Sequence, residues 1–124
     1  MLGKEAVALA DAWRPNGIGA EEKARWLSQI DGRLLKELYA LYDGEEKELP
    51  LYTPEGEEEL LAPPPYDELY VYGLCARYDF TMGEIERYNM DAMLFDEAWK
   101  GLAGYLQSVF APKQKNRVQG GNRP

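Results

Sequence analysis

Carboxylates are the residues of this chain with the clearest capacity for chemistry. They occur as two close pairs, Glu84 with Glu86 and Asp91 with Glu97, and as the glycine-interrupted run 55–59. Paired carboxylates in a pocket can act as general acid and base, and clustered ones can hold a divalent cation. The run lacks the alternating spacing of a calcium loop, and no nucleophile or cofactor-binding loop accompanies the pairs. We therefore predict no catalytic, metal or cofactor site, and no enzyme activity.

The rest of the composition also argues against catalysis. The sequence contains no histidine, which is the commonest general base and metal ligand. A single cysteine, Cys75, excludes an internal disulfide and is expected to be a small buried hydrophobic residue. No apolar run approaches the roughly 18 residues of a membrane helix, and the N-terminus lacks the layout of a signal peptide. We expect a single-domain cytoplasmic product.

Charge is distributed in two blocks of opposite sign. The 124-residue chain has a formal net charge of −8. Residues 43–59 contain eight acidic side chains and one basic one, whereas residues 113–124 contain four basic side chains and no acidic one. Such blocks favour oriented contacts with partners or with other copies of the chain. An acidic protein is poorly suited to binding nucleic acid through its body.

The chain is predicted to fold as an all-α bundle of four helices. Apolar residues recur at helical spacing near residues 4–13, 20–43, 66–80 and 82–110. Gly44 is expected to cap the second helix, and Thr81 to be the N-cap of the fourth in a capping box with Glu84. Five prolines keep residues 44–65 out of a helix, so we predict a long acidic loop with at most a short β-hairpin turning at 54–56.

The predicted core consists of apolar residues on the inward-facing side of these helices. Its members are Trp26, Leu27, Ile30, Leu34, Leu38, Leu69, Ala76, Ile85, Phe95, Trp99 and Leu102. The stripe of the fourth helix advances in alternating steps of three and four residues, which is typical of a helix that packs lengthwise against others. Residues 1–111 are thus predicted to form the helical domain, and residues 112–124 a flexible basic arm.

Tyrosines concentrate on the third helix and at the start of the fourth. Tyr66, Tyr70 and Tyr78 cannot all share one helix face with Tyr72, so some are expected to point outward. Tyrosine is favoured at interfaces because it buries a large ring and keeps a polar tip. Tyr66, Tyr70, Tyr78 and Tyr88 are therefore candidate subunit-interface residues. A core lined by tyrosines with satisfied hydroxyls remains an open alternative.

Three parts of the sequence together resemble a known family. They are Arg14–Asn16 with Glu22–Arg33, then Pro65–Tyr72, and then Gly83–Asn89 leading to Phe95 and Trp99. The chain is similar, over about residues 5–108, to the small head–tail connector (adaptor) proteins of tailed bacteriophages and prophages. The most specific element is the pairing of Tyr-Asp-Glu-Leu-Tyr with Glu-Ile-Glu-Arg-Tyr-Asn.

The resemblance implies a structural virion protein that assembles in the host cytoplasm. About a dozen copies would form a ring between the portal and a stopper or tail-completion protein, leaving a passage for DNA that is not specifically bound. No membrane is involved. The portal would be reached by the arm, with Lys113, Lys115, Arg117 and Arg123. The lumen or the stopper would be faced by Glu45, Glu46, Glu48, Tyr52, Glu55, Glu57, Glu58 and Glu59.

A second class of function fits the same composition. A phage- or prophage-encoded acidic helical protein could instead bind a single host partner. The connector hypothesis predicts ring-forming self-association, whereas the binding-protein hypothesis predicts a monomer or dimer with one dedicated partner. A carboxylate-dependent enzyme would need a closed pocket containing carboxylates with perturbed pKa values.

Overall fold

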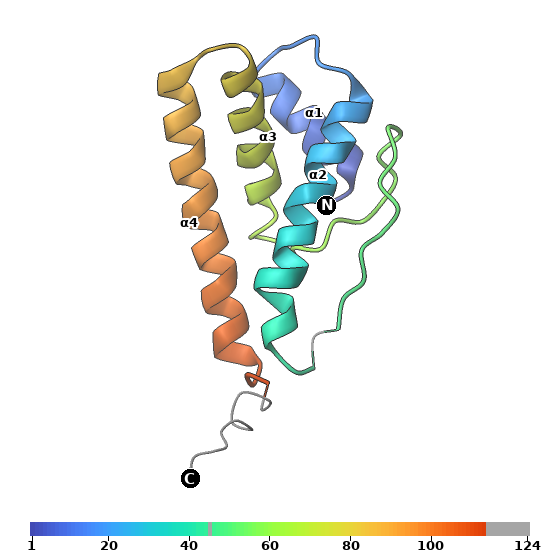
Figure 1. Ribbon diagram of the computed structural model, residues 1–124, viewed down its shortest axis with the longest axis vertical. Helices are drawn as coiled ribbons and strands as arrows, with labels where there is room; N and C mark the ends of the chain where they lie inside the picture. Colours follow the sequence, from blue (N-terminus) through green and yellow to red (C-terminus); the bar gives the residue numbers. More distant parts are fainter. Residues whose placement is uncertain (45, 114–124) are drawn as a thin grey trace.

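The computed structural model describes residues 1–44 and 46–113, and within these ranges it contains four α-helices, one short 3₁₀ helix and no β-sheet. The elements are α1 (Gly3–Trp13), α2 (Ala20–Glu37), η1 (Tyr39–Leu41), α3 (Glu68–Thr81) and α4 (Ile85–Val109). The predicted all-α fold is confirmed. Helix α3 lies centrally and contacts α1, α2 and α4 (Figure 1). None of the described helices combines the length and apolarity that crossing a bilayer demands.

The second helix is shorter than predicted. It ends at Glu37, and the chain continues as the tighter helix η1. The ring of Tyr39 is buried there, whereas Leu41 is exposed. Gly44 does adopt a left-handed conformation, with φ of 95°, but it lies beyond η1 and does not cap α2. The buried Tyr39 hydroxyl donates to the carbonyl of Leu61 at 3.3 Å. Through this hydrogen bond, η1 attaches the end of α2 to the loop.

The predicted capping box at the start of α4 is wrong. Thr81 is the last residue of α3, and Glu84 is the N-cap of α4, without a side-chain capping bond. Gly83 has a φ of 76°, and its N–H donates to the carbonyl of Phe80 at 3.2 Å. The N–H of Glu84 donates to the carbonyl of Asp79 at 2.8 Å. These two bonds form a Schellman motif, which keeps Thr81 helical and unavailable as an N-cap.

The long loop forms no hairpin with itself among its described residues. The predicted turn is present, because the N–H of Gly56 donates to the carbonyl of Thr53 at 3.0 Å. The second half of the loop pairs instead with the N-terminus, where Lys4 N–H donates to Gly56 at 2.9 Å and Leu60 N–H donates to Met1 at 3.0 Å. A Cβ on Gly56 would lie 2.5 Å from the Lys4 nitrogen, so only glycine permits this approach.

The predicted core is mostly confirmed. Trp26, Leu27, Leu34, Leu38, Leu69 and Leu102 are buried, and Cys75 is buried as expected. Ile30, Ala76, Phe95 and Trp99 are partly buried at its edge. Ile85 was placed in the core wrongly, since 56% of it is exposed. Helix α4 packs mainly on α3 and therefore buries a narrow face, whose fully buried residues are Asp91, Leu102 and Leu106.

Replacing Trp99 with alanine should lower the free energy of unfolding by about 2 kcal/mol. A fully buried tryptophan loses about 3–5 kcal/mol on truncation, but Trp99 is only partly buried, between Phe95 at 5.8 Å and the guanidinium of Arg33 at 4.6 Å. Urea denaturation measures the loss, and the fully buried Leu102→Ala is the matched control. A Trp99→Ala loss within about 0.5 kcal/mol, the usual range for surface changes, would contradict any role of the ring in packing.

Candidate functional site

The long loop is attached to the helices by a buried carboxylate, Asp31 of α2. Asp31 Oδ2 accepts a hydrogen bond from the Tyr52 hydroxyl at 2.5 Å and one from the Leu61 N–H at 3.2 Å. Asp31 Oδ1 accepts one from the Tyr70 hydroxyl, which in turn accepts from the Ala62 N–H at 2.8 Å. Burial raises the pKa of Asp31, and these hydrogen bonds oppose the rise. We call Asp31, Tyr52, Leu61 and Tyr70 the Asp31 anchor.

Two of the four candidate interface tyrosines are instead core residues. Tyr70 and Tyr78 are fully buried within the chain, so their predicted interface role is wrong. Tyr70 belongs to the Asp31 anchor, and Tyr78 packs against Trp26 with ring centroids 6.2 Å apart. Tyr66 and Tyr88 are only partly buried, which leaves them available for contacts.

Arg14 joins the end of α1 to both α3 and α4. Its Nε donates to Asp79 Oδ2 at 3.0 Å, and its Nη2 donates to Asp91 Oδ1 at 3.2 Å. Both aspartates are buried. We call these three residues the Arg14 bridge. The sequence offered Asp91 with Glu97 as a pair, but Glu97 is exposed and the carboxyl beside Asp91 belongs to Asp79.

The environment of the Arg14 bridge favours a protonated carboxyl. Burial and hydrogen-bonding contact with Asp79 raise the pKa of Asp91 to about 7, although the positive charge of Arg14 opposes the rise. Burial likewise raises the pKa of the neighbouring Cys75 to about 12, so this thiol is not activated. The other predicted carboxylate pair is on the surface, where Glu84 pairs with Arg87 at 3.4 Å and Glu86 is exposed. The Arg14 bridge therefore connects helices rather than presenting an acid to a substrate.

The stability of the protein should fall as the pH rises through about 7, and Asp91→Asn should remove most of that dependence. Asp91 has a pKa of 3.8 in the unfolded state and about 7 in the folded state, so between these pH values only the folded state holds the proton. The stabilisation of the folded state is therefore complete below about pH 4 and is lost as the pH rises through about 7. Urea denaturation between pH 5 and 8 measures this change. Asp96→Asn, at an exposed position of α4, is the control. A wild-type slope retained in Asp91→Asn would contradict the assignment.

The acidic loop presents fewer free carboxylates than the sequence predicts. Glu57 pairs with Lys4 Nζ at 3.1 Å, and Glu59 pairs with the N-terminal amine of Met1 at 2.9 Å. Glu58 was expected to face outward, but it is buried. It fits beside the first turn of α1 because Gly3 has no side chain; a Cβ there would lie 2.2 Å from Glu58 Oε2. Tyr52 is likewise turned inward, onto Asp31.

The remaining loop carboxylates form the exposed acidic surface. Glu46, Glu48 and Glu55 are exposed, and none of them makes an ion pair with another residue that the structure describes. Glu45 lies outside the described residues. The acidic surface predicted for this loop is thus present, although it is carried by part of the predicted set.

Residues 112 and 113 were assigned wrongly to the predicted flexible arm. The N–H of Lys113 donates to the carbonyl of Leu41 at 2.9 Å, and the N–H of Asp43 donates to the carbonyl of Ala111 at 2.9 Å. Residues 111–113 are therefore fixed to the segment after η1. The predicted portal contacts Lys115, Arg117 and Arg123 lie outside the described residues.

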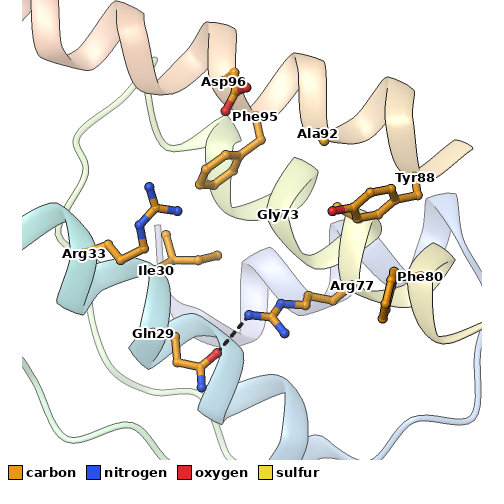
Figure 2. Close-up of a pocket in the computed structure, with 11 residues that line it drawn as sticks. Gln29, Ile30, Arg33, Gly73, Arg77, Phe80, Tyr88, Ala92, Phe95 and Asp96 are labelled. Atoms are coloured by element: carbon orange, nitrogen blue, oxygen red, sulfur yellow. Dashed lines mark hydrogen bonds between the residues drawn. The ribbon is translucent and has the colours of Figure 1, made fainter.

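A groove of about 390 Å³ opens between α2 and α4, and residues of α3 also line it (Figure 2). Its lining includes the apolar and aromatic residues Ile30, Phe95, Phe80 and Tyr88, the basic residues Arg33 and Arg77, and Asp96. The sequence did not indicate this groove. The spacing of Ile30 and Phe95 predicted core positions, and spacing does not reveal that α2 and α4 diverge. No group of three or more metal-binding side chains is present in the part of the chain that the structure describes.

No protein-family model, no curated protein and no solved structure matches this chain.

Proposed function

We propose that this chain is a structural head–tail connector that forms a ring between a portal and the downstream stopper or tail proteins of a tailed phage or prophage. The proposal starts from the resemblance of its three sequence segments to that family. One structural observation supports it. Asp31 from the first segment binds Tyr70 from the second, and Arg14 binds Asp91, two residues beyond the third. Residues in or beside the three resembling segments are thus neighbours in the folded chain, as the proposal requires.

The exposed apolar residues of the α3–α4 corner and of α4 also favour assembly. Met82, Ile85, Met90 and Met93 are each between 43% and 60% exposed. Single exposed hydrophobic residues are ordinary, but several on one element favour a contact surface. A carboxylate-rich loop at the lumen of such a ring would repel DNA phosphates and keep the passage free of adhesion.

Capsid binding tests the proposal. Purified protein should bind capsids that carry a portal, form a ring visible by electron microscopy at the portal vertex, and fail to bind capsids that lack a portal. Binding to neither kind of capsid would overturn the connector function. Capture of one host protein by a monomer or dimer, without capsid binding, would support the alternative of an acidic helical binding protein.

A further inference from the structure

Two exposed surfaces of different character lie on opposite sides of α2. The first is the groove between α2 and α4, which has an apolar floor and the two arginines Arg33 and Arg77 (Figure 2). The second is the loop tip, residues 48–55, which lies along the other side of α2 (Figure 1). There the loop borders a hollow with Ala24 and Ser28, residues of the α2 face turned away from the groove.

The loop tip combines exposed leucines with unpaired acids. Leu51 is 82% exposed and Leu49 is 47% exposed. They are flanked by Glu48 and Glu55, which make no ion pair with any other described residue. The hydroxyl of the adjacent Tyr52 donates to Asp31, which anchors the tip to α2 and reduces the entropy that it would lose when a partner binds. Two solvent-exposed leucines on an ordered acidic loop indicate a surface that a partner covers.

The groove has the complementary character. Phe95 and Ile30 provide apolar surface, and both pack directly on Gly73, where a Cβ would lie 2.8 Å from Ile30 Cδ1. Arg77 donates to Gln29 at 3.1 Å but makes no ion pair within the described residues, whereas Arg33 pairs with Glu37 of the same helix at 3.2 Å. One acid, Asp96 on α4, lies on the same lining. A volume of about 390 Å³ is sufficient for several side chains, since small-molecule pockets span roughly 300–1,000 Å³.

We propose that the loop tip of one copy binds in the groove of the next copy, with its leucines over the apolar floor and its glutamates beside the arginines. Because the two surfaces lie on opposite sides of α2, this contact is head-to-tail rather than two-fold. Head-to-tail contacts produce a closed ring when the rotation between copies closes. The inference rests on the proposed connector function and names the subunit contact that would build its ring.

Leu51→Ser is the first test. Leu51 is so exposed that the change should leave the circular dichroism and the unfolding midpoint unaltered. Loss of its burial at the contact should weaken self-association about tenfold to a hundredfold, as measured by sedimentation velocity over a concentration series. Leu9→Ser, at an exposed leucine of α1 that lines neither the groove nor the hollow beside the loop tip, is the matched control and should associate like the wild type. Equal association by Leu51→Ser and the wild type would overturn the proposal.

Exchanging the charges of the groove and the loop tip tests whether these two surfaces bind each other. The groove variant, Arg33→Glu with Arg77→Glu, and the loop variant, Glu48→Lys with Glu55→Lys, should each fail to self-associate, because like charges then face one another. An equimolar mixture should recover association, since each groove meets a loop of opposite charge. Lys100→Glu, an exposed reversal on α4 outside the groove lining, controls for net charge. No recovery in the mixture would overturn the pairing.

The outcomes separate this contact from the connector function. If the Leu51→Ser variant and the charge variants still form rings on portal-bearing capsids, the loop–groove contact is overturned, but the connector function is not. Self-association through these surfaces without any capsid binding would support the contact and overturn the function. A protein that remains monomeric at every concentration and forms no ring on capsids would overturn both the contact and the connector function.

Discussion

Replacing Arg14 with alanine should lower the free energy of unfolding by about 3–5 kcal/mol at neutral pH, because it leaves two buried carboxyls without their cationic partner. Asp79 and Asp91 are both buried, and Arg14 donates to each of them from the end of α1. The positive charge of Arg14 opposes the rise in the pKa of Asp91, so without it Asp91 would hold its proton to higher pH and Asp79 would lose its ion pair with α1. Urea denaturation at pH 7 and 8 measures the loss.

A control variant and a double-mutant cycle make this prediction specific to the Arg14 bridge. Arg87 also approaches Asp79, at 3.8 Å, but its side chain is 51% exposed, so Arg87→Ala should cost about 0–1 kcal/mol. In an Asp79→Asn, Asp91→Asn background, Arg14→Ala should cost much less than in the wild type, since no buried charge is left unpaired. A loss at Arg14 no larger than that at Arg87 would show that the Arg14 bridge does not hold the helices together.

Deleting residues 114–124 should abolish attachment to portal-bearing capsids while leaving the folded domain intact. The deletion begins after Lys113 because the backbone of residues 111–113 is bonded to residues 41–43. It removes the basic residues Lys115, Arg117 and Arg123. Each exposed ion pair contributes only about 0–1 kcal/mol, so attachment must depend on many copies acting together around a ring.

Sedimentation of capsids with full-length and truncated protein, at low and high salt, measures this effect. Neutralising the arm by Lys115→Gln, Arg117→Gln and Arg123→Gln provides a full-length control, which should weaken attachment most at low salt. If the truncated protein attaches as well as the full-length chain, the arm has no part in the mechanism. The acidic loop would then be the surface to test for portal binding.

The helices were predictable because apolar spacing and proline positions act locally. The stripe that includes Leu27 and Leu34 identifies α2, and the prolines identify the loop after it, although α2 ends at Glu37 rather than at residue 43. The Thr81 capping box was misread because Gly83 and Glu84 also complete a Schellman motif with Phe80 and Asp79 once Gly83 adopts a left-handed conformation. Both readings satisfy the sequence pattern, and only the hydrogen bonds of the folded chain distinguish them.

The buried polar contacts were harder to predict, although one left a signal. Asp31 lies on the buried stripe at the position between Leu27 and Leu34, and an acid there requires hydrogen-bond partners. That position could have indicated an anchor, but not that Tyr52 and Tyr70 complete it. The contact of Asp79 with Asp91 left no signal, since it forms across the α3–α4 turn and depends on how the two helices pack.

The two backbone hydrogen bonds that join residues 41–43 to residues 111–113 have a mechanical consequence. The chain enters its acidic loop directly after Asp43 and leaves its described domain directly after Lys113, so both charged segments start from one junction. A pulling force applied to the chain beyond Lys113 would load this junction before it could unwind α4. Tension on the C-terminal segment would thus be transmitted to the base of the acidic loop, and through η1 to α2, rather than being absorbed along α4.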